Sequence, residues 1–222
     1  MKILAYNINQ SSSEKINKVL GYNADIYILP EIACPSLVKL PEGFQMEWMG
    51  DLDFKGLGVI WKSDLIAEVP SWFNPKYQYF LPLLIDGKLI MAAWPTTTNH
   101  NKPMRYPQIA LLAFQEYAPY FKEYPTIISG DLNCYKGQSG QTKQFSIQAI
   151  FDFLGEMGIV SAYHNMTGEE LGKESKATYY HLFKENLPFF IDYTFSNIPI
   201  KSYCLGDWDK HTSDHVPQFI EF

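Results

Sequence analysis

Several polar side chains in this sequence stand where a short apolar run ends. "AYNIN" contains Asn7 and Asn9, "IYILPEI" contains Glu31, and "TIISGDLN" ends in Asp131 and Asn133. Carboxylate and amide oxygens are the ligands that Mg²⁺ prefers, and the ion usually keeps several of its waters. An Asp-x-Asn pair at a strand end can also hold a water and a phosphate oxygen. These residue types and spacings are typical of a magnesium site with a water positioned for attack.

An acid and a histidine further along the chain add a second chemical function. Asp192 lies inside the aromatic run "FFIDYTF", and Asp214 and His215 come just before the last apolar stretch. Asp192 is expected to be buried on at least one side, and a buried carboxylate needs a partner. An aspartate within reach of a histidine fixes its tautomer and supports its positive charge. A polarising ion, an oriented water and such a charged donor are what metal-assisted attack on a phosphoester requires.

Each of these positions also has a purely structural explanation. A glycine followed by Asp131 is typical of a turn, and Glu31 directly after a proline is typical of a solvated loop acid. Asp192 can be held by a structural pairing. Asp214 and His215 can form a polar turn into a strand, with Pro217 near the strand start, where a missing N–H costs least. Taken one at a time, the residues leave both explanations open.

The elements that must position these side chains alternate loosely between strands and helices. Helices are predicted at 11–22, where Ser11 and Glu14 have capping-box spacing, at 104–118, ended by Pro119, and at 144–157. Strands are predicted at 2–8, 25–30, 124–133, 189–196, 199–204 and 216–222, with a pair at 56–64 and 65–73 and a hairpin over 78–94 that turns at Asp86-Gly87. The pattern predicts one α/β domain over 1–222 whose sheets contain antiparallel pairs.

The order and context of these motifs resemble the endonuclease/exonuclease/phosphatase superfamily, which includes DNase-like and apurinic-endonuclease-like enzymes. The matching stretches are "AYNIN", "DIYILPEI", "GLGVIW", "SGDLN", "FFIDYTF" and "TSDHVP", and they cover nearly the whole chain in the order of the family. The resemblance implies a four-layer αββα sandwich, in which two packed mixed β-sheets are flanked by helices. It places the site at one rim of the sheets.

The resemblance also implies roles for individual residues. Glu31 matches the main metal ligand of the family, and Asn7 and Asp214 match an amide and an acid beside the metal. The implied ion is Mg²⁺, or Mn²⁺ in its place. The resemblance therefore implies a metal-dependent phosphodiesterase, most simply a nuclease.

The remaining catalytic positions match as well. Asp131 matches the acid that orients or deprotonates the attacking water, and Asn133 matches the amide beside it. Asp192 matches the acid paired with the catalytic histidine, and His215 matches that histidine, which stabilises charge on the phosphate. With this context, the Asp-His pair before the last strand is interpreted as a site delivered to the rim by a turn.

One region departs from the family pattern. Many members carry histidine, tyrosine or asparagine after the strand that corresponds to "LIMAAWPTTT", where this chain has Trp94, Thr96 and Thr97, with His100 a little later. Trp94 is either a phosphate donor or a packing residue. Arg105, the single arginine, is either a phosphate contact or a solvated helix residue. Asn9, Trp94 and Arg105 are the candidates for substrate binding.

Composition narrows the substrate class. The chain has 222 residues, 18 lysines and arginines against 24 acids, and a net charge of −6, which does not favour a long grip on duplex DNA. We therefore expect a nucleic acid contacted over a short length, or a small phosphoester. The alternatives are a phosphatase or other phosphoesterase acting on a small or lipid phosphoester, and a catalytically inactive binding module.

The same data give expectations on compartment and assembly. Three cysteines without CxxC spacing indicate no disulfide framework and fit a reducing compartment. The first residues reach Asn7 before any long apolar run, so no secretory signal is predicted, and no stretch is apolar enough to span a bilayer. We expect a cytoplasmic monomer without membrane association, and no protein partner is inferred.

Overall fold

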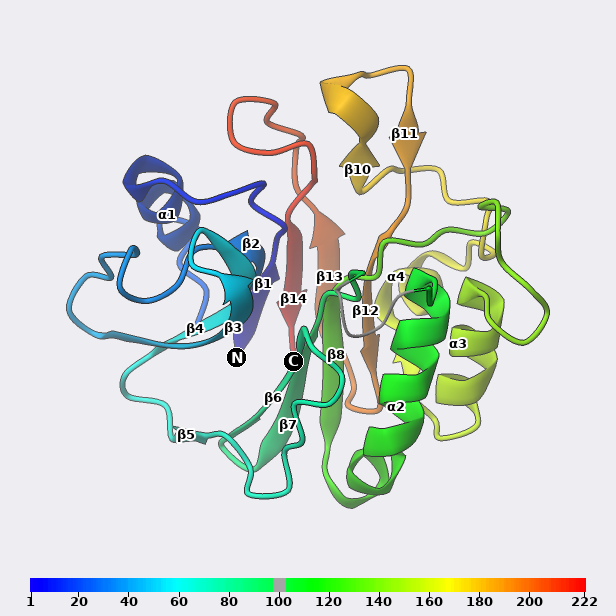
Figure 1. Cartoon of the computed structure of the whole chain (residues 1–222), viewed down its shortest axis with the longest axis horizontal. Helices are drawn as coiled ribbons and strands as arrows, with labels where there is room; N and C mark the ends of the chain where they lie inside the picture. Colours follow the sequence, from blue (N-terminus) through cyan, green and yellow to red (C-terminus); the bar gives the residue numbers. More distant parts are fainter. Residues whose placement is uncertain (98–102) are drawn as a thin grey trace.

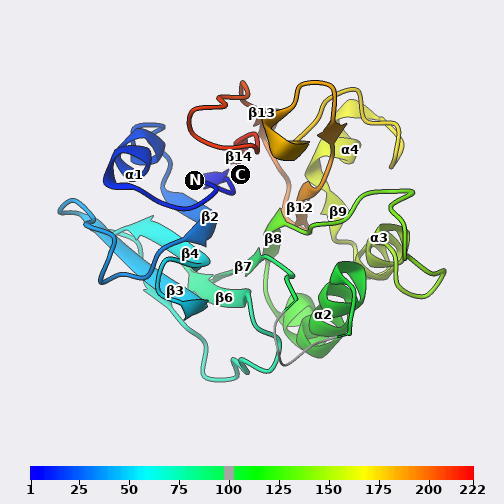
Figure 2. The same cartoon turned by 45° about the horizontal axis from the view of Figure 1, so that its top comes forward.

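Two six-stranded mixed β-sheets pack face to face in this structure, a computed structural model that describes residues 1–97 and 103–222. Helix α1 (Ser13–Leu20) covers one sheet, and α2 (Tyr106–Glu123) and α3 (Ile147–Gly155) cover the other (Figure 1). Turning the molecule shows α1 on one side of the strands and α2 and α3 on the opposite side (Figure 2). The predicted four-layer αββα sandwich is confirmed.

The first sheet has the strand order β13-β14-β1-β2-β4-β3. Its strand β1 pairs parallel with β2, and the other neighbours in the sheet are antiparallel. The bounds are β1 (Lys2–Ala5), β2 (Ile26–Ile32), β3 (Phe44–Leu52), β4 (Lys55–Lys62), β13 (Ser202–Leu205) and β14 (Gln218–Glu221).

The second sheet has the order β5-β6-β7-β8-β12-β9, in which β7 and β8 are parallel. Its bounds are β5 (Ala67–Glu68), β6 (Phe80–Ile85), β7 (Lys88–Ala93), β8 (Thr126–Asp131), β9 (Val160–Ser161) and β12 (Asp192–Ser196). A short helix α4 (Ala162–Thr167) follows β9. A separate hairpin of β10 (Tyr179–Tyr180) and β11 (Pro188–Phe189), joined through a 3₁₀ turn at His181–Phe183, projects from one end of the sandwich (Figure 1).

Strand β2 shows why the central strands have continuous apolar sequences. Ile26 and Ile28 contact the opposite sheet, and the alternating residues Tyr27 and Leu29 pack in the cluster that contains the buried face of α1. Successive side chains of a strand point to opposite faces, so a strand covered on both faces needs apolar residues at every position. Strand β8 is also covered on both faces, with Ile127 and Ile128 in different clusters, and its one interior polar side chain, Ser129, is paired with Thr194 of β12 at 2.7 Å.

Three predicted element boundaries were wrong. The N-cap of α1 is Ser12, which accepts a hydrogen bond from the Lys15 amide, whereas the Ser11 hydroxyl accepts one from the amide of Ala33. Pro119 lies inside α2, on its exposed side. A proline inside a helix costs about 3 kcal/mol, but the helix continues because Phe121 beyond it is buried against the sheet together with the rest of the apolar stripe.

The third wrong boundary concerns the predicted strand pair at 56–64 and 65–73. The first segment is β4, which pairs with β2 and β3, and the second contains the short strand β5, which pairs with β6 in the other sheet. Strand β3 itself was not predicted. The hairpin at Asp86-Gly87 is confirmed, and both residues have the positive φ that a tight hairpin turn needs. Within the described residues, no helix is both long and apolar enough to cross a membrane.

Candidate active site

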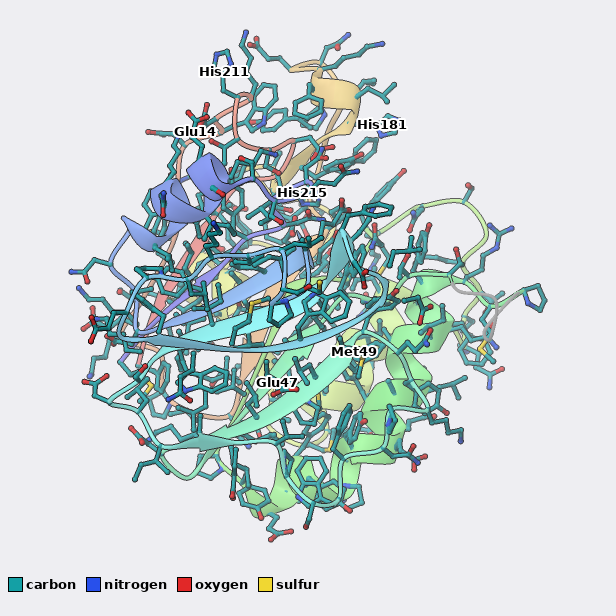
Figure 3. The ribbon with its side chains drawn as sticks, turned by 60° about the vertical axis from the view of Figure 1, so that its left-hand side comes forward. Glu14, Glu47, Met49, His181, His211 and His215 are labelled. Carbon is teal, nitrogen blue, oxygen red and sulfur yellow. The ribbon has the colours of Figure 1, made fainter. Side chains whose placement is uncertain are left out.

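The residues predicted to do chemistry gather around one cavity of about 350 Å³ at the end of the sandwich that carries the β10–β11 hairpin. Figure 3 shows His215 and His181 at this end of the molecule. Most of the predicted catalytic and metal residues line the cavity, together with aromatic side chains. The lining residues are Glu31, Tyr106, Asp131, Asn133, Tyr135, Gln138, Tyr179, His181, Phe189, Ile191, Asp214 and His215.

Strand pairing brings the two catalytic aspartates together. Asp131 is the last residue of β8 and lies directly opposite Asp192, the first residue of β12. His215 Nδ1 is 2.9 Å from Asp192 Oδ2, and His215 Nε2 is 3.8 Å from Asp131 Oδ2. All three side chains are buried, with exposed fractions of 1% to 4%. The predicted pairing of His215 with Asp192 is therefore present in the fold.

One side-chain hydroxyl holds the turn that delivers His215, and another holds the start of β12 at Asp192. Ser213 Oγ donates to the Asn7 carbonyl at 2.6 Å and accepts the His215 amide at 3.0 Å. Thr178 is fully buried, and its Oγ1 accepts both the Ile191 and the Asp192 amides at 2.9 and 3.0 Å. Thr178 thereby holds the backbone of Asp192 against the hairpin.

Burial and the neighbouring carboxylates shift the pKa values of Asp131 and His215. Burial raises the pKa of Asp131 to about 7, and the neighbouring Asp192 carboxylate acts in the same direction. Burial alone would lower the pKa of His215, but the Asp192 and Asp131 carboxylates outweigh it and raise that pKa to about 9. These shifts favour the charged imidazole of His215 and make Asp131 a stronger base than an aspartate in water.

Glu31 enters the cavity from a strained position. Its φ is +66°, at an irregularity of the β2–β4 pairing between Pro30 and Ile32. Positive φ is unfavourable for a non-glycine residue, and such strain persists where the surrounding structure fixes it, often at functional sites. Glu31 Oε1 accepts from Asn7 Nδ2 at 3.3 Å, and Oε2 pairs with Lys55 Nζ at 3.0 Å.

Asn7 lies where the sequence predicts it, but its amide is turned the other way. Its Oδ1 accepts the amide of Asn9 at 3.0 Å, so its Nδ2 faces the acids and donates to Asp131 Oδ2 at 3.0 Å as well as to Glu31. The backbone N–H of Asn9 fixes this orientation, because only the oxygen of the amide can accept it. Asn7 thus orients two carboxylates, and its role as a metal ligand stays a prediction.

Asn9 and Asp214 form a second polar contact at the rim. Asn9 Nδ2 donates to Asp214 Oδ1 at 2.8 Å. The loop that carries Asn9 is held by Lys15, whose Nζ donates to the carbonyls of Ile8 and Asn9 at 2.9 Å each. Asp214 lines the cavity, whereas Asn9 supports it from the side.

The other two substrate candidates lie away from the cavity lining. Trp94 is 4% exposed and packs edge-on against Tyr79, with ring centroids 4.9 Å apart, as a packing residue between the sheets. Arg105 is exposed and lines an adjacent cavity of about 420 Å³ that shares Tyr106 and Gln138 with the first. His100 lies outside the described residues.

Sequence reasoning missed the aromatic wall and one cation. Tyr179 lies with its ring centroid 4.6 Å from that of His215, and its hydroxyl is 2.8 Å from His181 Nδ1. Phe189 and Ile191 complete this wall. Lys55 was missed because nothing in the local sequence marks a strand-initial lysine as a partner of Glu31.

The residues present fit a divalent cation with oxygen ligands. Asp131, Asp192 and His215 offer ligand atoms within 4.8 Å of one another, and Glu31 and Asp214 face the same cavity. Glu31, Asp131 and Asp214 line the cavity, and the pKa of Asp131 is raised chiefly by burial and further by the Asp192 carboxylate, so a bound cation would offset negative charge that is poorly solvated here. Asp192 is already paired with His215. Glu31 and Asp214 line the cavity outside that pair, and they are the carboxylates that could hold such an ion.

Comparison with known proteins was made by sequence and by structure. No protein-family model and no curated protein matches the sequence. Three solved structures superpose over all of this chain: an AP endonuclease from Archaeoglobus fulgidus (TM-score 0.72, 14% identity, 99% of that chain), the 3′ phosphatase NExo from Neisseria bound to a product DNA hairpin (0.66, 16%, 99%), and the endonuclease domain of TRAS1, a telomere-specific non-LTR retrotransposon (0.68, 14%, 97%). The fold of this chain is therefore the one that these three structures share, and it is the fold expected from the resemblance of its motifs to the endonuclease/exonuclease/phosphatase superfamily.

Proposed function

We propose that this protein is a divalent-metal-dependent phosphodiesterase that cleaves nucleic acid. The observation that supports it most is the Asp131–His215–Asp192 cluster, which lies with Glu31 at one cavity. A base for water, a charged donor and an oxygen-rich cation site are thereby within reach of one phosphate group. The similarity of the fold to two endonucleases and a phosphatase is consistent with this chemistry.

In the proposed reaction each residue has one role. Asp131 accepts the proton of the attacking water, and its raised pKa suits a general base. The water oxygen bonds to phosphorus as the P–O ester bond breaks, and the leaving oxygen takes a proton from solvent. His215 donates from Nε2 to a phosphoryl oxygen as negative charge develops there, and Asp192 keeps it protonated and oriented. Asn133, whose Nδ2 is held by the Pro95 carbonyl at 3.2 Å, stands beside the water.

The cation site adds Lewis-acid chemistry to these groups. When Mg²⁺ or Mn²⁺ is bound through Glu31 and Asp214, it would polarise a phosphoryl oxygen. Asn7 orients the Glu31 and Asp131 carboxylates, because its Nδ2 donates a hydrogen bond to each of them. Glu31 reaches the cavity only because its backbone adopts the left-handed conformation.

The size and the apolar wall of the cavity support a short contact with the substrate. A cavity of about 350 Å³ is at the small end of ligand pockets and holds one nucleotide unit, not a base pair. Its wall of Tyr179, Phe189 and Ile191 can pack against a sugar ring or an unstacked base. A second candidate, supported by this small cavity, is release of a phosphate from the end of a strand.

A product assay tests the proposal directly. Wild-type protein is incubated with single-stranded, duplex and 3′-phosphorylated oligonucleotides and with small phosphomonoesters, with and without Mg²⁺. We expect cleavage that requires the ion and that is lost in Asp131→Asn. Equal turnover in wild type and Asp131→Asn, or turnover that is unaffected by a chelator, would refute the proposed function.

A further inference from the structure

A lysine pairs with the carboxylate of Glu31, the residue that is proposed to bind the metal. Lys55 is the first residue of β4, and its Nζ lies 3.0 Å from Glu31 Oε2. The same ammonium stands 5.3 Å from the ring centroid of Trp94. The side chains of Lys55 and Glu31 are 33% and 18% exposed, so this pair is partly shielded from water.

Both oxygens of Glu31 are engaged in this arrangement. Asn7 Nδ2 donates a hydrogen bond to Oε1, and the Lys55 ammonium forms an ion pair with Oε2. A divalent cation that binds through Glu31 must therefore share or displace the lysine. A single and a double positive charge on one carboxylate repel each other, and the flexible four-carbon stem of lysine allows the ammonium to move away.

The Lys55 ammonium already lies over the Trp94 ring while it pairs with Glu31, and it can keep this contact when it leaves the carboxylate. A lysine over an indole face is attracted to the ring, so Lys55 need not return to bulk water when it leaves Glu31. It would then be an unpaired cation near Glu31, which lines the cavity. This also gives a role to Trp94, at the position where many members of the superfamily have a polar residue.

We propose that Lys55 is an internal counter-cation of the metal site: it neutralises Glu31 in the metal-free protein, leaves Oε2 when a divalent cation binds, and then contacts a phosphate of the substrate. The proposal rests on the proposed function, because it requires a cation at Glu31. Lys55 couples metal loading to phosphate binding, since the group that contacts phosphate becomes free only when the metal is present.

The proposal predicts opposite effects on two affinities. Removing the charge of Lys55 removes a competitor of the metal, so the metal should bind more tightly. The same change removes a phosphate contact, so the substrate should bind more weakly. A lysine that only holds Glu31 in place would give the opposite result for the metal, because its removal would loosen a ligand.

Metal binding is measured first, on substrate-free protein titrated with Mn²⁺ and followed by electron paramagnetic resonance. We expect Lys55→Met to bind Mn²⁺ about tenfold more tightly than wild type, the effect of removing a charge roughly 6 Å from a divalent ion in water. Lys55→Arg keeps the charge and should resemble wild type.

Lys62→Met is the matched control. Lys62 ends the same strand, roughly 20 Å away at about 3.3 Å per residue, and pairs with Asp25 at 2.8 Å. The Lys62→Met substitution changes the net charge by the same amount as Lys55→Met but lies outside the site. The Mn²⁺ affinity of this variant should therefore equal that of wild type. Unchanged or weaker Mn²⁺ binding by Lys55→Met would overturn the proposal.

Substrate affinity is measured second, by titrating a fluorescent single-stranded oligonucleotide at saturating Mn²⁺ with Asp131→Asn present in every variant to prevent cleavage. Lys55→Met should bind roughly three- to tenfold more weakly than its parent, and Lys62→Met should not. Equal affinity in all three would remove the phosphate contact from the proposal and so refute it.

Glu31→Gln separates failure of this proposal from failure of the proposed function. If Glu31→Gln binds Mn²⁺ as well as wild type does, the metal is not held by Glu31, and both proposals fail. If Glu31→Gln loses Mn²⁺ but Lys55→Met does not gain it, only the role of Lys55 fails, and the metal-dependent phosphodiesterase stands.

Discussion

His215 bridges two aspartates that face each other across neighbouring strands. Its Nδ1 is 2.9 Å from Asp192 Oδ2, and its Nε2 is 3.8 Å from Asp131 Oδ2. One nitrogen is thus fixed by a close acid, while the other points at an acid just beyond hydrogen-bond distance. In the proposed function Nε2 is the nitrogen that donates to a phosphoryl oxygen, and the predictions below follow from this arrangement.

Replacing Asp192 by asparagine should lower the pKa of His215. In metal-free wild type that pKa is about 9, because the Asp192 and Asp131 carboxylates outweigh the effect of burial. With Asp192→Asn the nearest acid is gone, so the imidazole should titrate at lower pH. The measurement is an NMR titration of His215 in metal-free protein, and an unchanged titration would show that Asp192 does not control the charge of His215.

The raised pKa of His215 also predicts how the free energy of unfolding depends on pH. Because the folded pKa of His215, about 9, exceeds the ordinary histidine value of about 6.5, the folded state binds the extra proton between these values. The stability from this pair should be complete below about pH 6.5 and be lost as the pH rises through about 9. Urea unfolding of metal-free wild type and Asp192→Asn at both ends of this range checks the prediction, and the difference between them should be larger at the acidic end.

Replacing His215 by alanine should reduce turnover by roughly 10²–10⁴-fold, the scale of a lost general acid or charge-stabilising donor. Folding should be retained, as circular dichroism would show. The control is His211→Ala, because His211 is exposed on the loop before the site and lies apart from His215 (Figure 3). A fall in turnover in both variants would indicate a general effect of the loop.

Replacing Glu31 by glutamine should shift the Mg²⁺ concentration for half-maximal activity upward by about tenfold or more, since a charged ligand becomes a neutral one. Glu14→Gln serves as the control, because Glu14 is exposed on α1 and away from the cavity. Both variants lose one negative charge, so only loss of a ligand predicts a shift confined to Glu31. The curves are taken over a Mg²⁺ series at fixed ionic strength.

Replacing Thr178 by valine should destabilise the protein by about 1–3 kcal/mol, because two buried amides lose their acceptor. Turnover should fall as well, since the Asp192 backbone is no longer held. The free energy of unfolding is measured in urea and the activity in the oligonucleotide assay. Wild-type stability would show that the Thr178 hydroxyl does not hold β12.

The sequence determined the parts of this protein whose environment is set by nearby residues. The strand around Ile28 is an apolar run because both of its faces are covered, and Asp86-Gly87 turns the hairpin through its own backbone preferences. Glu31, Asp131, Asp192 and His215 could be predicted to form one site because polar residues interrupt such runs only at a cost. Their motifs also occur in the order of a known superfamily.

Only the tertiary structure decided which distant side chains meet and which way they face. Strand β3 carries mixed polar residues because it is the edge of its sheet, so it has no clear apolar pattern to predict. The orientation of Asn7 depends on the backbone of the Asn9 loop, and the burial of Trp94 on Tyr79. Lys55 meets Glu31 only because β4 pairs with β2, and a contact between residues far apart in the chain has no local signal when either side chain alone would be stable in water.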